Sequence, residues 1–222
     1  TRKDVMTVQA AENDLAVYII TGENEKDITG QFRSLIGRSY IPPLWAFGYG
    51  QSRWGYTTKE DFRKVAAGYR ENHIPLDMIY MDIDYMDSYK DFTLNPENFP
   101  DFPDFVKEMK DQELRLIPII DAGVKVESGY EVYEEGVEKR YFCQREDGSD
   151  FVAAVWPGDT HFPDFLNKDA RKWFGDKYSF LIRQGIEGFW NDMNEPAIFY
   201  SSEGMEEAKK LAGEFSQDKE GK

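Results

Sequence analysis

Residues 114–121, Leu-Arg-Leu-Ile-Pro-Ile-Ile-Asp, form a nearly continuous apolar run that ends in an aspartate. The run is short and rich in branched side chains, which is typical of a strand buried on both faces. It follows a segment in which apolar side chains recur at helical spacing, at Phe102, Phe105, Val106 and Met109. The pair predicts a helix that packs against the strand coming after it.

The same order of helix and apolar strand precedes this pair. Thr57 and Glu60 have the spacing of a capping box. Apolar residues then follow on one helical face, at Phe62, Val65, Ala66 and Tyr69. An apolar strand is expected after this helix, at residues 76–83.

The order also returns further along the chain. Asn167 is the expected cap of a third helix, and Gly185 is its expected end. A strand is expected at residues 188–193, and the apolar, aromatic residues 44–51 are expected to be the first strand. Strands that alternate with helices indicate the α/β class and a parallel sheet. We therefore predict a (β/α)8 TIM barrel, here only its first half, with about four βα units.

The chain is expected to have two parts that meet at residues 42–43, Pro-Pro. Residues 15–20 have the character of a short strand, and residues 25–37 have helical spacing with glycine at the end. Residues 1–43 are therefore predicted to be the end of an N-terminal β domain plus a linker helix, and residues 44–222 the half-barrel.

Residues 122–166 interrupt the alternation of helices and strands. The segment is rich in glycine, tyrosine and acidic residues, and it is predicted to be an inserted loop region at the active site. A short strand is expected within it, at residues 152–156. A further helix is expected at residues 203–215.

The composition argues against several classes of partner. The chain of 222 residues has a formal net charge of −15. Such a surface repels the phosphates of nucleic acids and of anionic membranes, so we expect neither as a partner and a neutral substrate fits best. Aromatic residues make up 15% of the chain, which is compatible with a large aromatic core and also with a cleft that stacks on sugar rings.

No cofactor and no metal are expected. No glycine-rich loop follows the first two predicted strands, so nucleotide binding is unsupported. His73 and His161 are the only histidines and lie far apart, and a calcium loop beginning at Asp82 would need a ligand where Met86 stands. Cys143 is the only cysteine, which excludes an intrachain disulfide. The sequence shows no signal-peptide pattern and no membrane-spanning apolar run, so a cytoplasmic location is expected.

Acidic residues lie at the carboxyl ends of three predicted strands. Asp82 lies at this end of the second strand, Asp121 at that of the third, and Asp192 at that of the fourth. In a (β/α) barrel the carboxyl ends of the strands converge on the active site. Glycoside cleavage needs one carboxyl group to attack or stabilise the anomeric carbon and another to protonate the leaving oxygen. The positions of these acids therefore predict a site that acts on sugars.

Residues 188–196, Gly-Phe-Trp-Asn-Asp-Met-Asn-Glu-Pro, resemble the nucleophile motif of glycoside hydrolase family 31, Trp-x-Asp-Met-Asn-Glu. Further segments are similar to the family at residues 49–54, 82–86, 99–100 and 155–158. The likeness extends over about residues 14–215 and is nearest to bacterial α-glucosidases.

The resemblance implies a retaining, exo-acting α-glucosidase, with Asp192 as the nucleophile that forms a covalent glycosyl-aspartate. It implies that Asp82 binds sugar hydroxyls, that Asp121 binds hydroxyls or orients its neighbours, and that Trp54 helps to select the linkage. Glu195 is implied to position Asp192 without touching the sugar. The residues implied to wall the first sugar subsite are Ile83, Ile120, Trp156, Trp190 and Met193.

In the family, the acid/base aspartate lies on a later strand, beyond the position of Asp192. We therefore expect that the 222 residues on their own lack the acid/base residue, are inactive alone and can form a homo-oligomer. The implied substrates are α-linked gluco-oligosaccharides such as maltose or isomaltose. Two alternatives stay open: a non-catalytic half-barrel that serves as a scaffold or weak sugar-binding module, and an α-transglucosylase.

Overall fold

The computed structural model describes residue 6, residues 16–201 and residue 204. The chain divides into two compact units, residues 1–43 and 44–222. The helix expected at residues 203–215 lies outside the described residues, apart from residue 204.

The first unit contains the expected helix, α1 (Glu25–Ile36). Asn24 caps it by accepting a hydrogen bond from the Asp27 backbone N–H, and Gly37 ends it with a φ of 95°. The strand expected at residues 15–20 is wrong for the part described, because residues 16–20 form no strand. Val17, Tyr18 and Ile19 are exposed there, and no strand among the described residues pairs with this apolar run.

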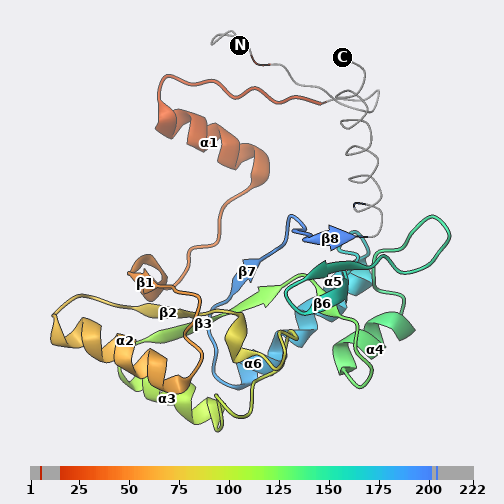
Figure 1. Ribbon diagram of the computed structural model, residues 1–222. Helices are drawn as coiled ribbons and strands as arrows, with labels where there is room; N and C mark the ends of the chain where they lie inside the picture. Colours follow the sequence, from red (N-terminus) through yellow and green to blue (C-terminus); the bar gives the residue numbers. More distant parts are fainter. Residues whose placement is uncertain (1–5, 7–15, 202–203, 205–222) are drawn as a thin grey trace, which may run out of the picture. The chain divides into compact units, whose positions relative to one another are not determined.

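The second unit is built on a parallel four-stranded sheet (Figure 1). Its strands are β1 (Gly50–Gln51), β2 (Met78–Met81), β3 (Arg115–Asp121) and β7 (Trp190–Asp192), in the order β1-β2-β3-β7. The connecting helices are α2 (Lys59–Glu71), α3 (Phe102–Asp111), α5 (Lys168–Lys177) and α6 (Ser179–Arg183). Each parallel strand pairs with the next one along the chain, as in a barrel. The predicted α/β half-barrel is confirmed.

The first strand is much shorter than expected at residues 44–51. Residues Leu44–Phe47 form a 3-10 helix, η1, which is closed by a hydrogen bond from the Gly48 N–H to the Trp45 carbonyl. The Tyr49 N–H donates to the Asp77 carboxylate at 3.0 Å. A Cβ on Gly48 would meet the same carboxylate at 2.0 Å. Asp77, one residue before β2, thus binds the backbone just ahead of Gly50, where the first strand begins.

Helix α2 begins one residue later than the spacing of Thr57 and Glu60 indicated. Thr58 is the N-cap, and its side chain and Asp61 form the capping box. The hydrogen bond from the Thr58 hydroxyl is the main cause of the lowered pKa of Asp61. The expected helical face is correct, since Phe62 and Ala66 are buried in the core.

The segment 122–166 is more regular than predicted. It contains β4 (Val124–Lys125), α4 (Glu131–Glu138), β5 (Ala153–Val155) and β6 (Gly158–His161). These strands and β8 (Tyr200–Ser201) form an antiparallel sheet in the order β4-β6-β5-β8. The strand expected at residues 152–156 is confirmed as β5, whereas α4 was not predicted.

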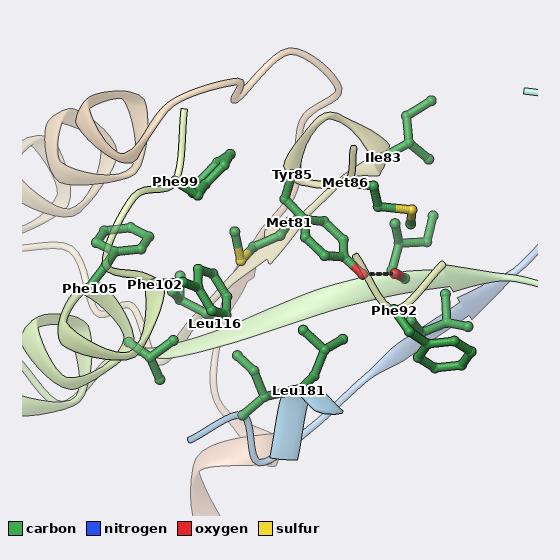
Figure 2. Close-up of a cluster of buried hydrophobic side chains, with 14 of the residues drawn as sticks. Met81, Ile83, Tyr85, Met86, Phe92, Phe99, Phe102, Phe105, Leu116 and Leu181 are labelled. Atoms are coloured by element: carbon green, nitrogen blue, oxygen red, sulfur yellow. Dashed lines mark hydrogen bonds between the residues drawn. The ribbon is translucent and has the colours of Figure 1, made fainter. Parts of the chain in front are cut away.

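The main core lies between the parallel sheet and its helices (Figure 2). Met81 and Leu116 come from the strands, and Phe102 and Phe105 from α3. All four apolar residues predicted on the α3 face are buried. The turn after β2, the 3-10 helix η2 (Ile83–Tyr85), adds its two apolar side chains to the same core. The packing fixes the carboxyl ends of β2 and β3, where the candidate site lies.

Candidate active site

Asp121 and Asp192 lie on one face of the parallel sheet. They are register partners at the ends of β3 and β7, and partners in parallel strands project their side chains to the same side. Trp190 shares this face, since it lies two residues before Asp192 on β7. Asp82 lies one residue beyond the end of β2, at a position that continues the same alternation. The acids expected to converge therefore do so.

Asp121 lies close enough to Asp192 and Asp82 for their charges to affect its pKa. Asp121 is only 4% exposed, and burial raises its pKa from 3.8 to about 7. The charges of Asp192 and Asp82 add to the rise, in that order. At neutral pH the Asp121 carboxyl is therefore divided between its protonated and ionised forms, and it can donate or accept a hydrogen bond.

Asp82 caps the short helix η2. Its carboxylate accepts a hydrogen bond from the Ile83 N–H at 2.8 Å. The Ile83 side chain is buried among core residues. Ile120 alternates with Asp121 on β3 and belongs to the same core cluster. The structure therefore places both isoleucines in the core cluster, although Ile120 also borders a cavity of about 400 Å³ that Asp121 and Asp192 share.

Trp190 and Met193 lie on either side of Asp192. The Trp190 ring meets Tyr80 edge to face, with ring centroids 6.0 Å apart. Met193 has a left-handed backbone, with a φ of 57°, which costs a non-glycine residue about 1 kcal/mol. Its side chain packs against the small core cluster of Ala153, Val155 and Phe162. The second sheet therefore anchors the turn that follows Asp192.

Three exposed aromatic rings form a ledge, which we define as Trp54, Trp156 and Phe199. Trp54 and Trp156 lie 5.9 Å apart, and Phe199 meets Trp156 edge to face at 4.8 Å. The rings are 64%, 42% and 52% exposed, respectively. The Phe199 N–H donates to the Ala154 carbonyl, which fixes Phe199 to β5. Phe199 was not predicted from the sequence, because its contact with Trp156 depends on the pairing of β8 with β5.

Asp84 connects the ledge to the acids. Burial raises its pKa and the charge of Asp82 raises it further, while a hydrogen bond from the Trp54 indole opposes the rise. Trp54 is therefore held from two sides, by Asp84 and by Trp156. Glu195, expected to position Asp192, is exposed.

In the part of the chain that the structure describes, no group of three or more His, Cys, Asp or Glu side chains could hold a metal ion. Within the same residues, no helix has the length and apolarity required to cross a membrane.

A parallel half-barrel that gathers aspartates at its strand ends, beside exposed aromatic rings, is the arrangement expected of a glycosidase of the TIM-barrel type. Comparison with known families refines this class. Residues 39–219 match the family described as "Glycosyl hydrolases family 31 TIM-barrel domain", and the chain belongs to glycoside hydrolase family 31.

The similar proteins are longer than this chain. Alpha-glucosidase 2 of Bacillus thermoamyloliquefaciens is 41% identical over 206 residues, which are 93% of this chain and 26% of the relative. An alpha-glucosidase of Saccharolobus solfataricus is 35% identical, over 88% of this chain and 28% of the relative. The chain thus spans about a quarter of the length of these curated relatives.

Solved structures show the same fold. The family 31 alpha-glucosidase from Bacteroides thetaiotaomicron has a TM-score of 0.72 and 36% identity, over 81% of this chain and 31% of that chain. A family 31 dextranase from Flavobacterium johnsoniae, solved with isomaltotriose, has a TM-score of 0.74 and 26% identity, over 83% of this chain and 23% of that chain.

Proposed function

We propose that this chain carries the nucleophile and part of the first sugar subsite of a retaining, exo-acting α-glucosidase. The observation that carries the proposal is the shared face of Asp82, Asp121 and Asp192 at the carboxyl ends of neighbouring strands. An anionic Asp192 would attack the anomeric carbon, form a glycosyl ester and stabilise the oxocarbenium-like transition state. Water would then hydrolyse the ester and release glucose.

The neighbouring residues fit complementary roles. Asp82 and Asp121 have carboxyl oxygens that suit sugar hydroxyls, and the Trp190 ring lies on the same face as Asp192. Trp156 would wall the subsite from the second sheet, and Met193 would hold the turn after the nucleophile. Ile83 and Ile120 would support the wall of the subsite from within the core. Glu195, whose side chain is exposed, would position Asp192.

We propose that the substrates are neutral α-linked gluco-oligosaccharides such as maltose or isomaltose. Two observations support this: relatives carry the name alpha-glucosidase, and the family 31 dextranase was solved with isomaltotriose. The net charge of −15 also favours an uncharged ligand over an anionic one. Trp54 would contact the sugar beyond the bond that is cleaved, since it lies on the exposed ledge at the rim of the site.

The experiment is a chimera that supplies a complete relative around this chain. Residues 39–219 replace the matching segment of Alpha-glucosidase 2 of Bacillus thermoamyloliquefaciens, and glucose release from maltose and isomaltose is measured. We expect the chimera to release glucose and Asp192→Asn to abolish release while leaving the fold intact. Asp176→Asn, on the exposed face of α5, is the matched control.

A mechanism-based fluorosugar provides the second readout. It should label a peptide that contains Asp192 in the active chimera. Labelling of Asp82 or Asp121 instead, or full activity of the Asp192→Asn chimera, would refute the assignment.

A further inference from the structure

Two buried carboxyl oxygens have no hydrogen-bond partner among the described residues. They are Oδ2 of Asp91 and Oδ1 of Asp121. Asp91 is 1% exposed and Asp121 is 4% exposed, so bulk solvent is largely excluded from both side chains. Buried polar atoms are rarely left unsatisfied, and the pair therefore requires a physical explanation.

The position of Asp91 follows from the unequal lengths of two strands. The pairing of β2 with β3 ends at Met81 and Pro118, whereas β3 continues to Asp121. Beyond that point, side chains replace the missing strand. Oδ1 of Asp91 accepts a hydrogen bond from the Asp121 N–H at 3.0 Å, and the Tyr85 hydroxyl donates to the Ile119 carbonyl at 2.7 Å, as the dashed line in Figure 2 shows.

Three tyrosine hydroxyls surround Asp91, but each donates elsewhere. Tyr85 donates to the Ile119 carbonyl. Tyr130 donates to the backbone carbonyl of Asp91 at 2.8 Å, rather than to its carboxyl group. Tyr178 donates to the Asn191 side chain at 2.6 Å. None of these donors is left for Oδ2 of Asp91.

The ammonium group of the neighbouring Lys90 is also engaged in ion pairs with other residues. The Lys90 ammonium pairs with Asp87 at 2.9 Å and with Glu127 at 2.7 Å. An ionised Asp91 would therefore be a buried charge held by one backbone N–H, an arrangement that is strongly unfavourable. A protonated Asp91 has a hydroxyl to donate, and Oδ1 of Asp121 is an acceptor without a donor.

We propose that Asp91 is a carboxylic acid that keeps its proton at neutral pH, donates a hydrogen bond to the Asp121 carboxyl and so positions Asp121 beside Asp192. Asp91 is thus a positioning residue. Its importance for sugar chemistry rests on the function proposed above, but its protonation does not.

The electrostatics of the described groups agree with this assignment. Burial raises the pKa of Asp91 well above 3.8, the charge of Asp121 adds to the rise, and the bond from the Asp121 N–H opposes it. The groups that face Asp91 are Asp121 from β3, Tyr85 from η2, Tyr130 before α4 and Tyr178 between α5 and α6. All three phenols have raised pKa values, so they stay neutral and supply no charge that would favour an ionised Asp91.

The test compares Asp91→Asn with Asp91→Ala in the 222-residue chain. An asparagine reproduces the protonated acid, because its oxygen accepts from the Asp121 N–H and its amide donates to Asp121. We expect Asp91→Asn to fold with wild-type stability and to leave the Asp121 titration, followed by carboxyl 13C NMR, unchanged. Asp91→Ala should be less stable and should raise the pKa of Asp121, since the donor is lost.

A charged Asp91 gives a different result. Replacing a buried negative charge by a neutral amide would lower the pKa of Asp121 by about 1 unit or more. That shift, or a failure of Asp91→Asn to fold, would overturn the proposal. Asp176→Asn controls for a change of charge on the surface.

Infrared spectroscopy tests the proton directly. At about two pH units above the Asp121 midpoint, the wild-type chain should still show the carbonyl band of a protonated carboxylic acid. Asp91→Asn should remove this band, and a wild-type spectrum without it would contradict the proposal. Both readouts are made without sugar, so a failure of the proposed α-glucosidase activity would not affect them.

Discussion

Asp121 and Asp192 are register partners at the carboxyl ends of neighbouring parallel strands, with Asp121 buried and Asp192 half-buried. The ionised form of Asp121 is therefore disfavoured twice, first by burial and then by the charge of its partner. Sugar hydroxyls that enter between the two residues would meet one carboxyl group able to donate and one able to accept. The interaction between these two carboxyl groups affects the pKa of Asp121 and, through it, the pH dependence of stability.

Asp121→Asn should stabilise the chain at high pH. The pKa of Asp121 is about 7 in the folded chain against 3.8 for the free side chain. The folded state therefore binds the proton more tightly, and the stability that Asp121 contributes is present below 3.8 and lost as the pH rises through about 7. Asparagine removes this loss, so the variant should gain up to about 4 kcal/mol over wild type above pH 7.

Urea denaturation at about pH 5 and about pH 8 measures this difference. The gap in unfolding free energy between variant and wild type should be larger at the higher pH. Asp176→Asn serves as the control, and a gap that does not depend on pH would show that Asp121 is not the titrating group.

Asp192→Asn should lower the pKa of Asp121. The substitution removes the second-largest cause of the shift but leaves burial, the largest, in place. The Asp121 midpoint should therefore fall and stay above 3.8, which 13C NMR of the side-chain carboxyl can follow. If the midpoint does not move, the two carboxyl groups are not in electrostatic contact.

Trp54→Tyr should change the preference for linkage in the chimera. The smaller ring loses contact with Trp156 and with Asp84, so the sugar beyond the cleaved bond would meet a different wall. We expect the ratio of kcat/KM for isomaltose to that for maltose to change. An equal change of both values would indicate that Trp54 has a structural role only.

The 222 residues expressed alone should release no glucose from maltose or isomaltose above an Asp192→Ala control. Trp54 and Trp156 are 64% and 42% exposed, and water weakens the electrostatic stabilisation that a nucleophile can give. A positioned proton donor is worth about 10² to 10⁴ in rate. Release that depends on Asp192 would show that a local acid such as Asp121 donates the proton.

The same chain should elute larger than a monomer on size exclusion. Strands β1 and β7 are the edges of the parallel sheet, and unpaired edges favour association. Elution as a monomer at all concentrations would contradict this expectation.

The acids at the strand ends were predictable from sequence because strand alternation and barrel geometry are local rules. Asp121 and Asp192 needed only the positions of their strands. The predicted length of the first strand, residues 44–51, was wrong. Apolar patterning does not reveal that the Asp77 carboxylate binds the Tyr49 N–H. The division at residues 42–43, the site roles and the cytoplasmic location stay predictions.

Other features depend on contacts between distant segments and leave no local pattern. Phe199 joins the ledge only because β8 pairs with β5. Nothing in the sequence distinguishes Asp91 from the other acidic residues, because its role depends on the hydrogen bond that it accepts from the Asp121 N–H. Ile83 and Ile120 belong to the core cluster, and Ile120 also borders the cavity that Asp121 and Asp192 share, so their expected place at the sugar stays a prediction.

The early end of β2 affects which loops can replace the segment after β2 during evolution. Where two strands run side by side, a new residue in one disturbs the register of both. Here the end of β3 is held by hydrogen bonds from Tyr85 and to Asp91. We therefore expect that the loop bearing these two residues can be replaced as a unit without a change in strand register. A loop transplanted from a relative should be accepted when it brings both anchors and rejected when it brings one.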